Sequence, residues 1–512
     1  MAEPIRITGR LLTRNWVLNL AGQVLPLGVA VLAMPYVIHG LGAERFGILS
    51  IAWTLLGFCG LLDLGLGRAT TKFVAECLGS GELEKLPAIV WTSLSTQVSF
   101  GAVGALLAVS LIPALVDRVL KTSPALAQDT KTSFVILAAA LPVVIAGNAF
   151  RGVLEAAQHF HVVNYIKIPA TVCIYLLPAL ALPLGLGLPG TVFFLGLARL
   201  GAMVAYAAAC LRFFPGLRRR FHLDRQLLRP LLVYGGWVTV SNLVGPLLVY
   251  MDRFFIGTLV SVAAVGYYAA PYEVVTRAWV LPASLATTIF PAFSSLQATG
   301  SSNRNEELCA RSLKSILLML GPPLLLVIAF ARQILGFWLG ADYAVQGTLV
   351  LQILAAGVLI NSLAQILFSL LQGLGRPDLV AKFHVIELPL YGVLLWFLLK
   401  HMGIAGAALA WTLRVTADAL LLFIAVFWLK VVSWRGFVRN GLQKSAAVVS
   451  GFGLLLAGLG LAAQSGWMRE SFSAILVLAF GLAAWGYVLD PRDKQIVLST
   501  AAVFRSALAK AR

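Results

Sequence analysis

Hydrophobic residues in this chain are grouped into long apolar runs that are separated by short polar segments. A helix needs about 20 mostly apolar residues to cross the hydrocarbon core of a bilayer. The runs of sufficient length predict an all-α, polytopic membrane protein with about fourteen membrane-spanning helices. We expect these helices at 15–38, 46–77, 86–113, 131–157, 160–183, 189–213, 229–251, 262–295, 308–331, 344–373, 378–399, 404–429, 443–463 and 470–489.

The composition points the same way. Hydrophobic residues make up 60% of the chain, charged residues only 12%, and the mean hydropathy is +0.90. Soluble globular proteins carry about 25% charged residues. The composition therefore excludes an ordinary soluble protein.

The net charge of +18 raises the question of a nucleic-acid partner, but the location of the charge argues against one. With both termini in the cytoplasm, the Lys and Arg residues divide 27 to 8 between the cytoplasmic and external sides, with four left inside spans. Such an excess marks the cytoplasmic side of membrane proteins. We expect the run Arg218–Arg220, with Arg225 and Arg229, to act as an orientation signal and to contact anionic lipids.

Short motifs recur at an offset of about 216 residues and indicate an internal repeat. Ile166-Lys167-Ile168-Pro169 is echoed by Ile386-Glu387-Leu388-Pro389, and Gly187-Leu188-Pro189-Gly190 by Gly403-Ile404-Ala405-Gly406. Repeat-built transporters place their substrate site between the repeats. We expect two six-helix lobes around a central cavity, followed by an extra helical hairpin. The predicted parts are a cytoplasmic N-terminus 1–14, an N-lobe 15–215, a basic linker 216–228, a C-lobe 229–430, a hairpin 443–489 and a cytoplasmic tail 490–512.

We single out eight ionisable residues inside the predicted spans, where charge is costly and marks functional sites by default. They are Asp63, Lys167, Arg199, Glu273, Arg277, Glu387, Arg414 and Asp418. The i,i+4 spacing places Glu273 with Arg277, and Arg414 with Asp418, on one helix face. Each pair serves either a functional site or the stability of the bundle. Lys167 and Arg199 have no acid at helical spacing, so their partner is either a substrate or another helix.

Signatures of metal binding and enzyme catalysis are absent from the sequence. The five cysteines are far apart, and no CxxC or Cys/His pair predicts a metal site. The sequence also has no phosphate-binding loop for ATP. The longest external loop, 114–130, contains only Asp117 and Asp129 as acids and offers no paired-acid motif. We therefore expect no cofactor, no metal and no enzymatic activity.

Several glycine-rich motifs resemble one known family. They include Gly42-Ala43-Glu44-Arg45-Phe46-Gly47, Gly60-Leu61-Leu62-Asp63-Leu64-Gly65-Leu66 and Gly152-Val153-Leu154-Glu155-Ala156-Ala157-Gln158. Asp252-Arg253-Phe254-Phe255-Ile256-Gly257, which leads to Val265-Gly266-Tyr267-Tyr268, continues the match. The pattern covers residues 10–430 and resembles the O-antigen and exopolysaccharide flippases of the multidrug/oligosaccharidyl-lipid/polysaccharide exporter superfamily.

This resemblance implies an ion-coupled flippase or antiporter in the bacterial inner membrane. Its cargo would be an undecaprenyl-pyrophosphate-linked oligosaccharide, moved from the cytoplasmic to the periplasmic leaflet. Cations can replace the water around a diphosphate, so Lys167, Arg199, Arg277 and Arg414 are the expected cargo-binding residues. Asp63, Glu273, Glu387 and Asp418 are the candidates for binding the coupling proton or sodium ion. Membrane lipids, a polysaccharide polymerase and chain-length machinery are the expected partners.

Three alternatives remain open at this point. A multidrug exporter or a peptidoglycan-precursor flippase of the same superfamily would share the helical architecture. A membrane glycosyltransferase or polymerase would act on similar lipid-linked sugars. Such an enzyme usually needs a large external loop or domain with catalytic acids, and this sequence shows none.

Overall fold

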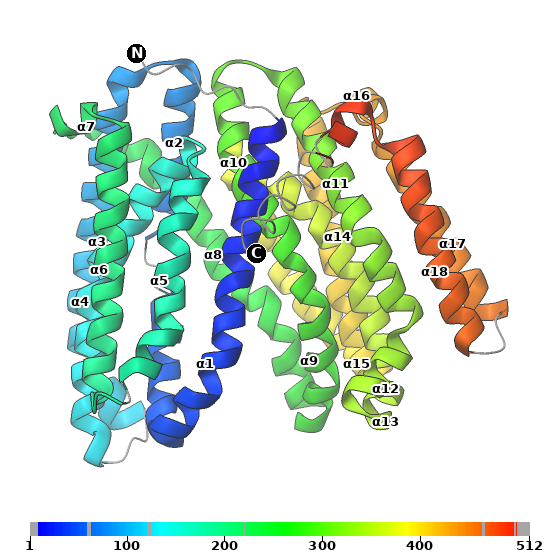
Figure 1. The fold of residues 1–512 in the computed structure, drawn as a ribbon, viewed down its shortest axis with the longest axis horizontal. Helices are drawn as coiled ribbons and strands as arrows, with labels where there is room; N and C mark the ends of the chain where they lie inside the picture. The colour runs from blue at the N-terminus through cyan, green and yellow to red at the C-terminus, as the bar shows by residue number, and fades with distance from the viewer. Residues whose placement is uncertain are drawn as a thin grey trace, which may run out of the picture. The chain divides into compact units, whose positions relative to one another are not determined.

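The computed structural model describes residues 9–58, 63–119, 124–181, 183–219, 221–462, 466–495 and 498, and this part of the chain contains helices and no strand (Figure 1). Eleven of the described helical segments are long and apolar enough to cross a membrane. The prediction of an all-α polytopic membrane protein is confirmed, while the count of fourteen spans is not. Most of the predicted cytoplasmic N-terminus 1–14 and most of the predicted tail 490–512 lie outside the described residues.

The chain divides into two compact units, with one boundary between Asn242 and Leu243 inside helix α8; residues 9–14, at the start of α1, group with the second unit. The helices of the first unit are α1 (Gly9–Phe58), α2 (Leu66–Ser80), η1 (Leu83–Lys85), α3 (Leu86–Ala114), η2 (Leu115–Val119), α4 (Pro124–Ala156), α5 (Phe160–Ala181), α6 (Leu188–Phe213), α7 (Gly216–Arg219) and the start of α8 (Arg225–Leu259). Within this unit α4 packs against α2, α3 and α6.

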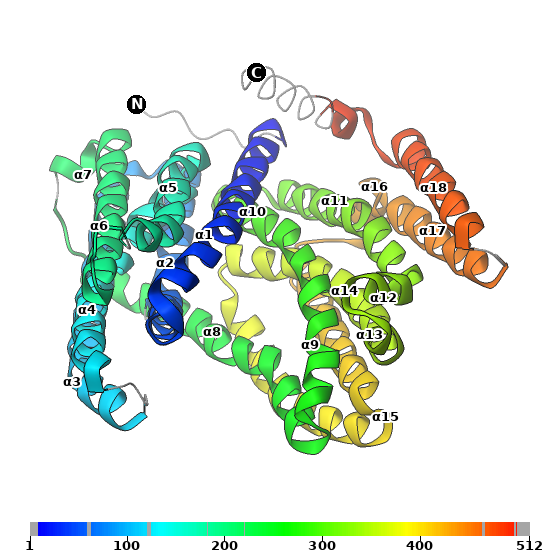
Figure 2. The same ribbon diagram turned by 60° about the horizontal axis from the view of Figure 1, so that its bottom comes forward.

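The second unit begins with the end of α8. It continues with α9 (Val262–Thr276), η3 (Arg277–Trp279), α10 (Val280–Ala298), α11 (Ser302–Ala329), α12 (Ala331–Leu339), α13 (Ala341–Gln346), α14 (Thr348–Gly373), α15 (Pro377–Trp428), α16 (Trp434–Arg439), α17 (Leu442–Ala462), α18 (Gly466–Ala483) and η4 (Ala484–Val488). Helix α14 packs against α10, α11 and α15, and α17 packs against α11 and α18 (Figure 2).

The turns between helices support the internal repeat. The turn after α2 has left-handed Gly81, and the amide of Glu82 donates to the carbonyl of Cys77. The turn after α10 repeats this pattern with left-handed Gly300 and a hydrogen bond from Ser301 to Leu296. The turns after α4 and α14 also match each other. The amide of His159 donates to the carbonyl of Leu154, and the amide of Arg376 donates to the carbonyl of Leu371. Each closes a helix with the Schellman hydrogen-bond pattern.

The predicted continuous span 46–77 is wrong. Helix α1 ends at Phe58, Asp63 to Gly65 form a turn, and α2 begins at Leu66. Gly65 has φ 69°, and a Cβ there would lie 2.3 Å from the carbonyl oxygen of Gly235 on α8. Only glycine permits both this backbone conformation and so close an approach.

Two other predicted boundaries differ from the structure. Helix α1 is continuous through 39–45, where the sequence predicted a break between the first two spans. Helix α8 was expected to end at 251 but continues to Leu259, so Asp252 and Arg253 lie within it. The two spans predicted at 378–399 and 404–429 agree with the structure, because α15 consists of two helices that meet at Gly403, where the backbone is not helical (φ 57°, ψ −143°).

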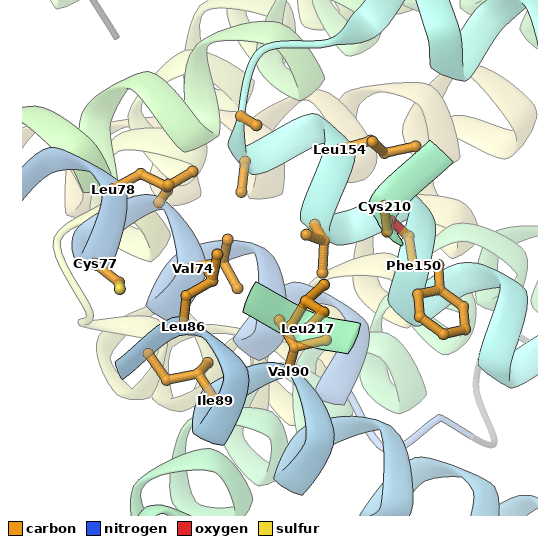
Figure 3. Close-up of a cluster of buried hydrophobic side chains, with 14 of the residues drawn as sticks. Val74, Cys77, Leu78, Leu86, Ile89, Val90, Phe150, Leu154, Cys210 and Leu217 are labelled. Carbon is orange, nitrogen blue, oxygen red and sulfur yellow. The ribbon is translucent and has the colours of Figure 1, made fainter. Parts of the chain in front are cut away.

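One hydrophobic core of the first unit joins α2, α3, α4, α6 and α7 (Figure 3). Val74, Val90 and Leu154 are almost completely buried in it, and Cys210 packs beside Phe150. Leu217 of the short helix α7 is also buried here. The predicted linker 216–228 is therefore partly packed into the first unit.

Candidate functional site

Lys167 lies half-buried on the membrane-crossing helix α5 of the first unit. The charges of Arg151 and Glu155 on α4 act on it. Arg151 Nε is 3.3 Å from Glu155 Oε1, so this carboxylate is already shared with a second cation. Among the residues that the structure describes, no carboxylate forms an ion pair with Lys167. The group of Lys167, Arg151 and Glu155 carries an excess of one positive charge.

Arg199 lies half-buried on α6 of the same unit. Its charge acts on the hydroxyl of Tyr206, which also feels Arg151 and Glu155. The Tyr206 hydroxyl donates a 3.4 Å hydrogen bond to the carbonyl of Val163 on α5. These contacts connect α4, α5 and α6 around one basic region. Arg151 is not among the eight ionisable residues singled out from the sequence, so its place beside Lys167 was missed.

Asp63 does not lie inside a continuous helix as expected. It sits in the turn before α2, where its Oδ1 accepts a 2.8 Å hydrogen bond from the amide of Gly65 and its carbonyl accepts from Leu66. A short acidic side chain that bonds the backbone two residues ahead stabilises such a turn. Asp63 thus has a structural role, whatever its part in ion binding.

Glu387 and Arg414 form a buried ion pair in the second unit. Arg414 Nη1 is 3.4 Å from Glu387 Oε2, and the side chains are 10% and 6% exposed. The two residues come from opposite sides of the bend at Gly403. Asp418 also interacts electrostatically with Glu387, Arg414 and His384. The ion pair of Arg414 is therefore with Glu387, and not with the i+4 residue Asp418 that the spacing favoured.

A third buried carboxylate lies close to this pair. Asp252 is completely buried on α8, and its Oδ2 accepts a 2.5 Å hydrogen bond from the hydroxyl of Tyr268 on α9. The charge of Arg414 acts on Asp252, and both act on Tyr391 of α15. Sequence reasoning missed Asp252 because it ended the helix one residue earlier. The apolar run Phe254-Phe255-Ile256 after it was the available signal for a longer helix.

Glu273 and Arg277 do pair as their spacing predicted, with a distance of 3.4 Å from Arg277 Nη2 to Glu273 Oε2. Glu273 also binds Arg253, whose Nη2 is 2.9 Å from Glu273 Oε1. Arg277 remains 72% exposed, whereas Arg253 is 23% exposed and stacks over Tyr272. Glu273, Arg253 and Arg277 therefore form a polar, partly exposed group of ion pairs in the second unit.

The structure therefore groups the predicted residues by unit. Glu387, Arg414 and Asp418 lie together, and Asp252 joins them. The acids of this group outnumber its arginine by three to one. Two of their oxygens, Glu387 Oε1 and Asp418 Oδ1, are buried without a hydrogen-bond donor, and so is the Tyr391 hydroxyl. In the described part of the chain, no group of His, Cys, Asp or Glu is arranged to hold a metal ion.

Solved structures similar to this one are membrane transporters. A transporter of the multidrug resistance MATE family, of the MOP superfamily, in an outward-facing conformation has a TM-score of 0.69 at 15% identity, covering 83% of this chain and 99% of that chain. A MATE structure in a bent conformation has a TM-score of 0.70 at 16% identity, covering 86% and 100% of the two chains. At this identity the likeness defines the fold: a multi-pass membrane protein with a MATE-like transporter architecture.

Sequence relatives identify the family. The family described as polysaccharide biosynthesis protein matches residues 12–297. A Shigella flexneri protein named as an O-antigen transporter is 31% identical over 80% of this chain and 96% of its own length. A Haloferax volcanii protein named as a flippase of low-salt glycan biosynthesis is 28% identical over 38% of this chain and 41% of its own. The chain belongs to this family of polysaccharide biosynthesis proteins, and the names of these relatives agree with the resemblance of its motifs to polysaccharide flippases.

Proposed function

We propose that this protein moves an undecaprenyl-pyrophosphate-linked oligosaccharide from the cytoplasmic to the periplasmic leaflet of the bacterial inner membrane. The family, the transporter fold and the names of the relatives support this function. The observation that carries the residue-level proposal is Lys167, a lysine on a membrane-crossing helix without an ion-pair partner among the described residues. The flipped oligosaccharide would then be the substrate of a polysaccharide polymerase.

The cargo's diphosphate needs cations because a lipid diphosphate carries two to three negative charges that an apolar slab cannot solvate. Lys167 and Arg199 supply this charge in the first unit, with Arg151 as a further contributor. Arginine can bind two phosphate oxygens through its planar fork, and lysine acts as a point charge. Arg277 and Arg414 bind acids in this conformation, so their contact with cargo requires exchange of an ion pair.

Ion coupling belongs to the acids of the second unit. Three buried carboxylates, Asp252, Glu387 and Asp418, face one buried arginine, and an unbalanced buried charge is expensive. A bound proton would relieve this imbalance better than a sodium ion, because Arg414 repels a metal cation beside Glu387. Glu387 and Asp418 are the residues that we propose take up and release the proton. Glu273 and Asp63 are secondary candidates, because Arg253 and Arg277 neutralise Glu273 and the amide of Gly65 binds Asp63.

Cargo binding is tested by Lys167→Ala in a strain that lacks the chromosomal copy of this gene. Loss of one charge-assisted contact, about 1.5–3 kcal/mol, should lower polysaccharide export at least tenfold at unchanged protein level. Lipid-linked oligosaccharide should accumulate. Lys85→Ala is the matched control, because Lys85 is an exposed lysine paired with Glu82. Normal export from Lys167→Ala would remove the proposed diphosphate site.

Ion coupling is tested with purified protein in liposomes that contain a fluorescent lipid-linked oligosaccharide. Glu387→Gln should keep some flipping without a gradient but lose its acceleration by a pH gradient. Glu84→Gln, at an exposed acid, is the control. A Glu387→Gln variant that still responds fully to the pH gradient would contradict the role of this carboxylate. Acceleration by a sodium gradient alone would assign sodium as the coupling ion.

A further inference from the structure

The segment that connects α6 to α8 is fastened to the first unit. Leu217 of α7 is 2% exposed within the hydrophobic core (Figure 3). The indole Nε1 of Trp91 donates a 3.2 Å hydrogen bond to the carbonyl of Leu217. The amide of Asp224 donates a 2.9 Å hydrogen bond to the hydroxyl of Thr92. The connecting segment, which we call the strap, is thus packed and hydrogen-bonded against α3, so the position of its outer side is fixed relative to the first unit.

The outer side of this strap combines positive charge with exposed apolar side chains. We call it the linker face and define it by Arg212, Phe213, Arg218, Phe221, Leu223, Arg225 and Arg229. All four arginines are exposed, and within the described residues none forms an ion pair with a carboxylate. Phe221 is 68% exposed although its ring touches that of Trp91, at a centroid distance of 5.2 Å. Leu223 is 49% exposed.

Helix stability does not explain these arginines. Arg225 and Arg229 lie in the first two turns of α8, where the helix dipole disfavours cations. The first turn of α8 contains no acid, and the side chain of Asp224 accepts from the amide of Gln226. Because these arginines are exposed and form no ion pair with a described carboxylate, they are free to bind an anionic partner from outside the chain.

The location of the linker face indicates which kind of anion it binds. Helices α6 and α8 are both long and apolar enough to cross the membrane, and the linker face begins where α6 ends and continues into the start of α8. Such a segment lies at the level of the lipid headgroups. Arginine forks match phosphate oxygens, while aromatic side chains insert at the boundary between headgroups and acyl chains. Charge and hydrophobicity are both complementary to an anionic lipid surface.

We propose that the linker face binds the headgroups of anionic phospholipids and so holds the strap between α6 and α8 on the membrane surface. This function is separate from cargo transport and does not depend on it. The same phosphate chemistry occurs in the diphosphate of the cargo and in free phosphate. The linker face takes the phospholipid because exposed Phe221 and Leu223 need an apolar layer that a soluble phosphate lacks.

The test compares Arg225→Gln/Arg229→Gln with a matched control, Lys85→Gln/Arg492→Gln. The control removes two exposed cations that are already paired with carboxylates. Native mass spectrometry of purified full-length protein would measure the binding of phosphatidylglycerol and phosphatidylcholine. Each arginine should contribute about fivefold, so the linker variant should bind phosphatidylglycerol about 25-fold more weakly. Binding of phosphatidylcholine should change little, and the control should behave as the wild type.

Two further measurements separate the sources of phosphate. Phe221→Ser should weaken phosphatidylglycerol binding without changing the charge. Inorganic pyrophosphate, added as the probe for a diphosphate, should not displace phosphatidylglycerol from the wild type. Equal affinity of the linker variant and the control for phosphatidylglycerol would overturn the proposal. Full competition by inorganic pyrophosphate, with no effect of Phe221→Ser, would also overturn it and assign the face to a soluble or cargo diphosphate.

Discussion

Helix α5 of the first unit and the first half of α15 in the second unit follow the same kind of turn but carry opposite charges. Lys167 lies nine residues after left-handed Gln158, and Glu387 lies twelve residues after left-handed Gly375. A difference of three residues is close to one helical turn, so both residues lie on similar helix faces. The two units therefore share the geometry of this turn but carry opposite charges on the helix that follows it.

The surroundings of the two residues differ as much as their charges. Glu387 has an arginine partner and two neighbouring carboxylates, Asp418 and Asp252. Lys167 has no ion-pair partner among the described residues and shares its surroundings with Arg151. The second unit therefore contains a group in which three acids surround one arginine, and the first contains a cation available to an external anion. This contrast suits a division of labour in which the first unit binds cargo and the second binds the coupling ion.

The largest expected effect comes from removing the compensating cation of the second unit. Arg414→Leu leaves three buried carboxylates without their arginine, and breaking a buried ion pair costs about 3–5 kcal/mol. We expect a large loss of thermal stability of the detergent-solubilised protein, measured by size-exclusion chromatography after heating. Lys167→Leu, at the corresponding place in the first unit, should change the stability by less than about 1 kcal/mol because it leaves no acid unpaired.

A double variant separates loss of charge compensation from loss of packing. Arg414→Leu/Glu387→Leu removes one carboxylate together with the arginine, so it should be more stable than Arg414→Leu alone. If the double variant were the less stable protein, the contribution of Arg414 would lie in packing. Equal losses from Arg414→Leu and Lys167→Leu would abolish the contrast between the units.

The sequence predicted helices where apolar runs end at clear polar signals. Helix α5 was expected at 160–183 and runs Phe160–Ala181, and α6 was expected at 189–213 and runs Leu188–Phe213. The break before α2 was missed because Asp63 and Gly65 lie inside a continuous apolar run, where turn chemistry prevailed over hydropathy. Helix spacing alone could find the pair of Glu273 and Arg277.

The site in the second unit needed tertiary information. Glu387 and Arg414 are 27 residues apart and meet only because α15 bends at Gly403. The i,i+4 spacing favoured Asp418 as the partner of Arg414, because helix spacing identifies only neighbours one turn away on the same helix. Asp252 reaches the same group from α8, through contacts with α9. A single sequence contains the residue types of such a group but not the approach of three helical elements.

The second-largest expected loss of stability comes from the first unit, at the close approach of the turn before α2 to α8. Gly65→Ala places a Cβ 2.3 Å from Gly235 O and 2.8 Å from Val238 Cβ. The left-handed backbone adds about 1–2 kcal/mol and overpacking about 1–3 kcal/mol, so we expect a loss of about 2–5 kcal/mol. Thermal melting in detergent measures it. A variant as stable as the wild type would show that this helix contact is not tight.

A clasp of ion pairs at the C-terminal end of the hairpin has no counterpart described in the first unit. Lys314 of α11 is 3% exposed and binds Asp493, and Arg311 lies 3.6 Å from Asp490. Leaving an isolated buried charge would destabilise the fold by about 3–5 kcal/mol. Lys314→Ala should lower the free energy of unfolding by less, about 1–3 kcal/mol, because Arg311 still faces both acids. Thermal melting at neutral pH is the measurement, and Lys382→Ala, at an exposed lysine of the same unit, is its control.

The pH dependence of the clasp gives a second criterion. Burial raises the pKa of Asp490, but the amide of Asp493 and the charges of Lys314 and Arg311 lower it further, so the pKa lies below its usual range. A carboxylate of this kind stabilises the fold at neutral pH and loses that contribution as the pH falls through its lowered pKa. The difference between Lys314→Ala and the wild type should therefore shrink on acidification below about pH 4. A difference independent of pH would assign the effect of Lys314 to packing.

The smallest expected effect tests the repeat itself. Gly81 and Gly300 end α2 and α10 in matching turns, with φ of 79° and 63°, and an added Cβ would meet nothing within 4 Å at either position. Gly81→Ala and Gly300→Ala should each cost only the left-handed penalty of about 1–2 kcal/mol. Because the two turns share one hydrogen-bond pattern, the two losses in thermal stability should be equal within error. Unequal losses would mean that the units differ in their scaffold as well as in their charges.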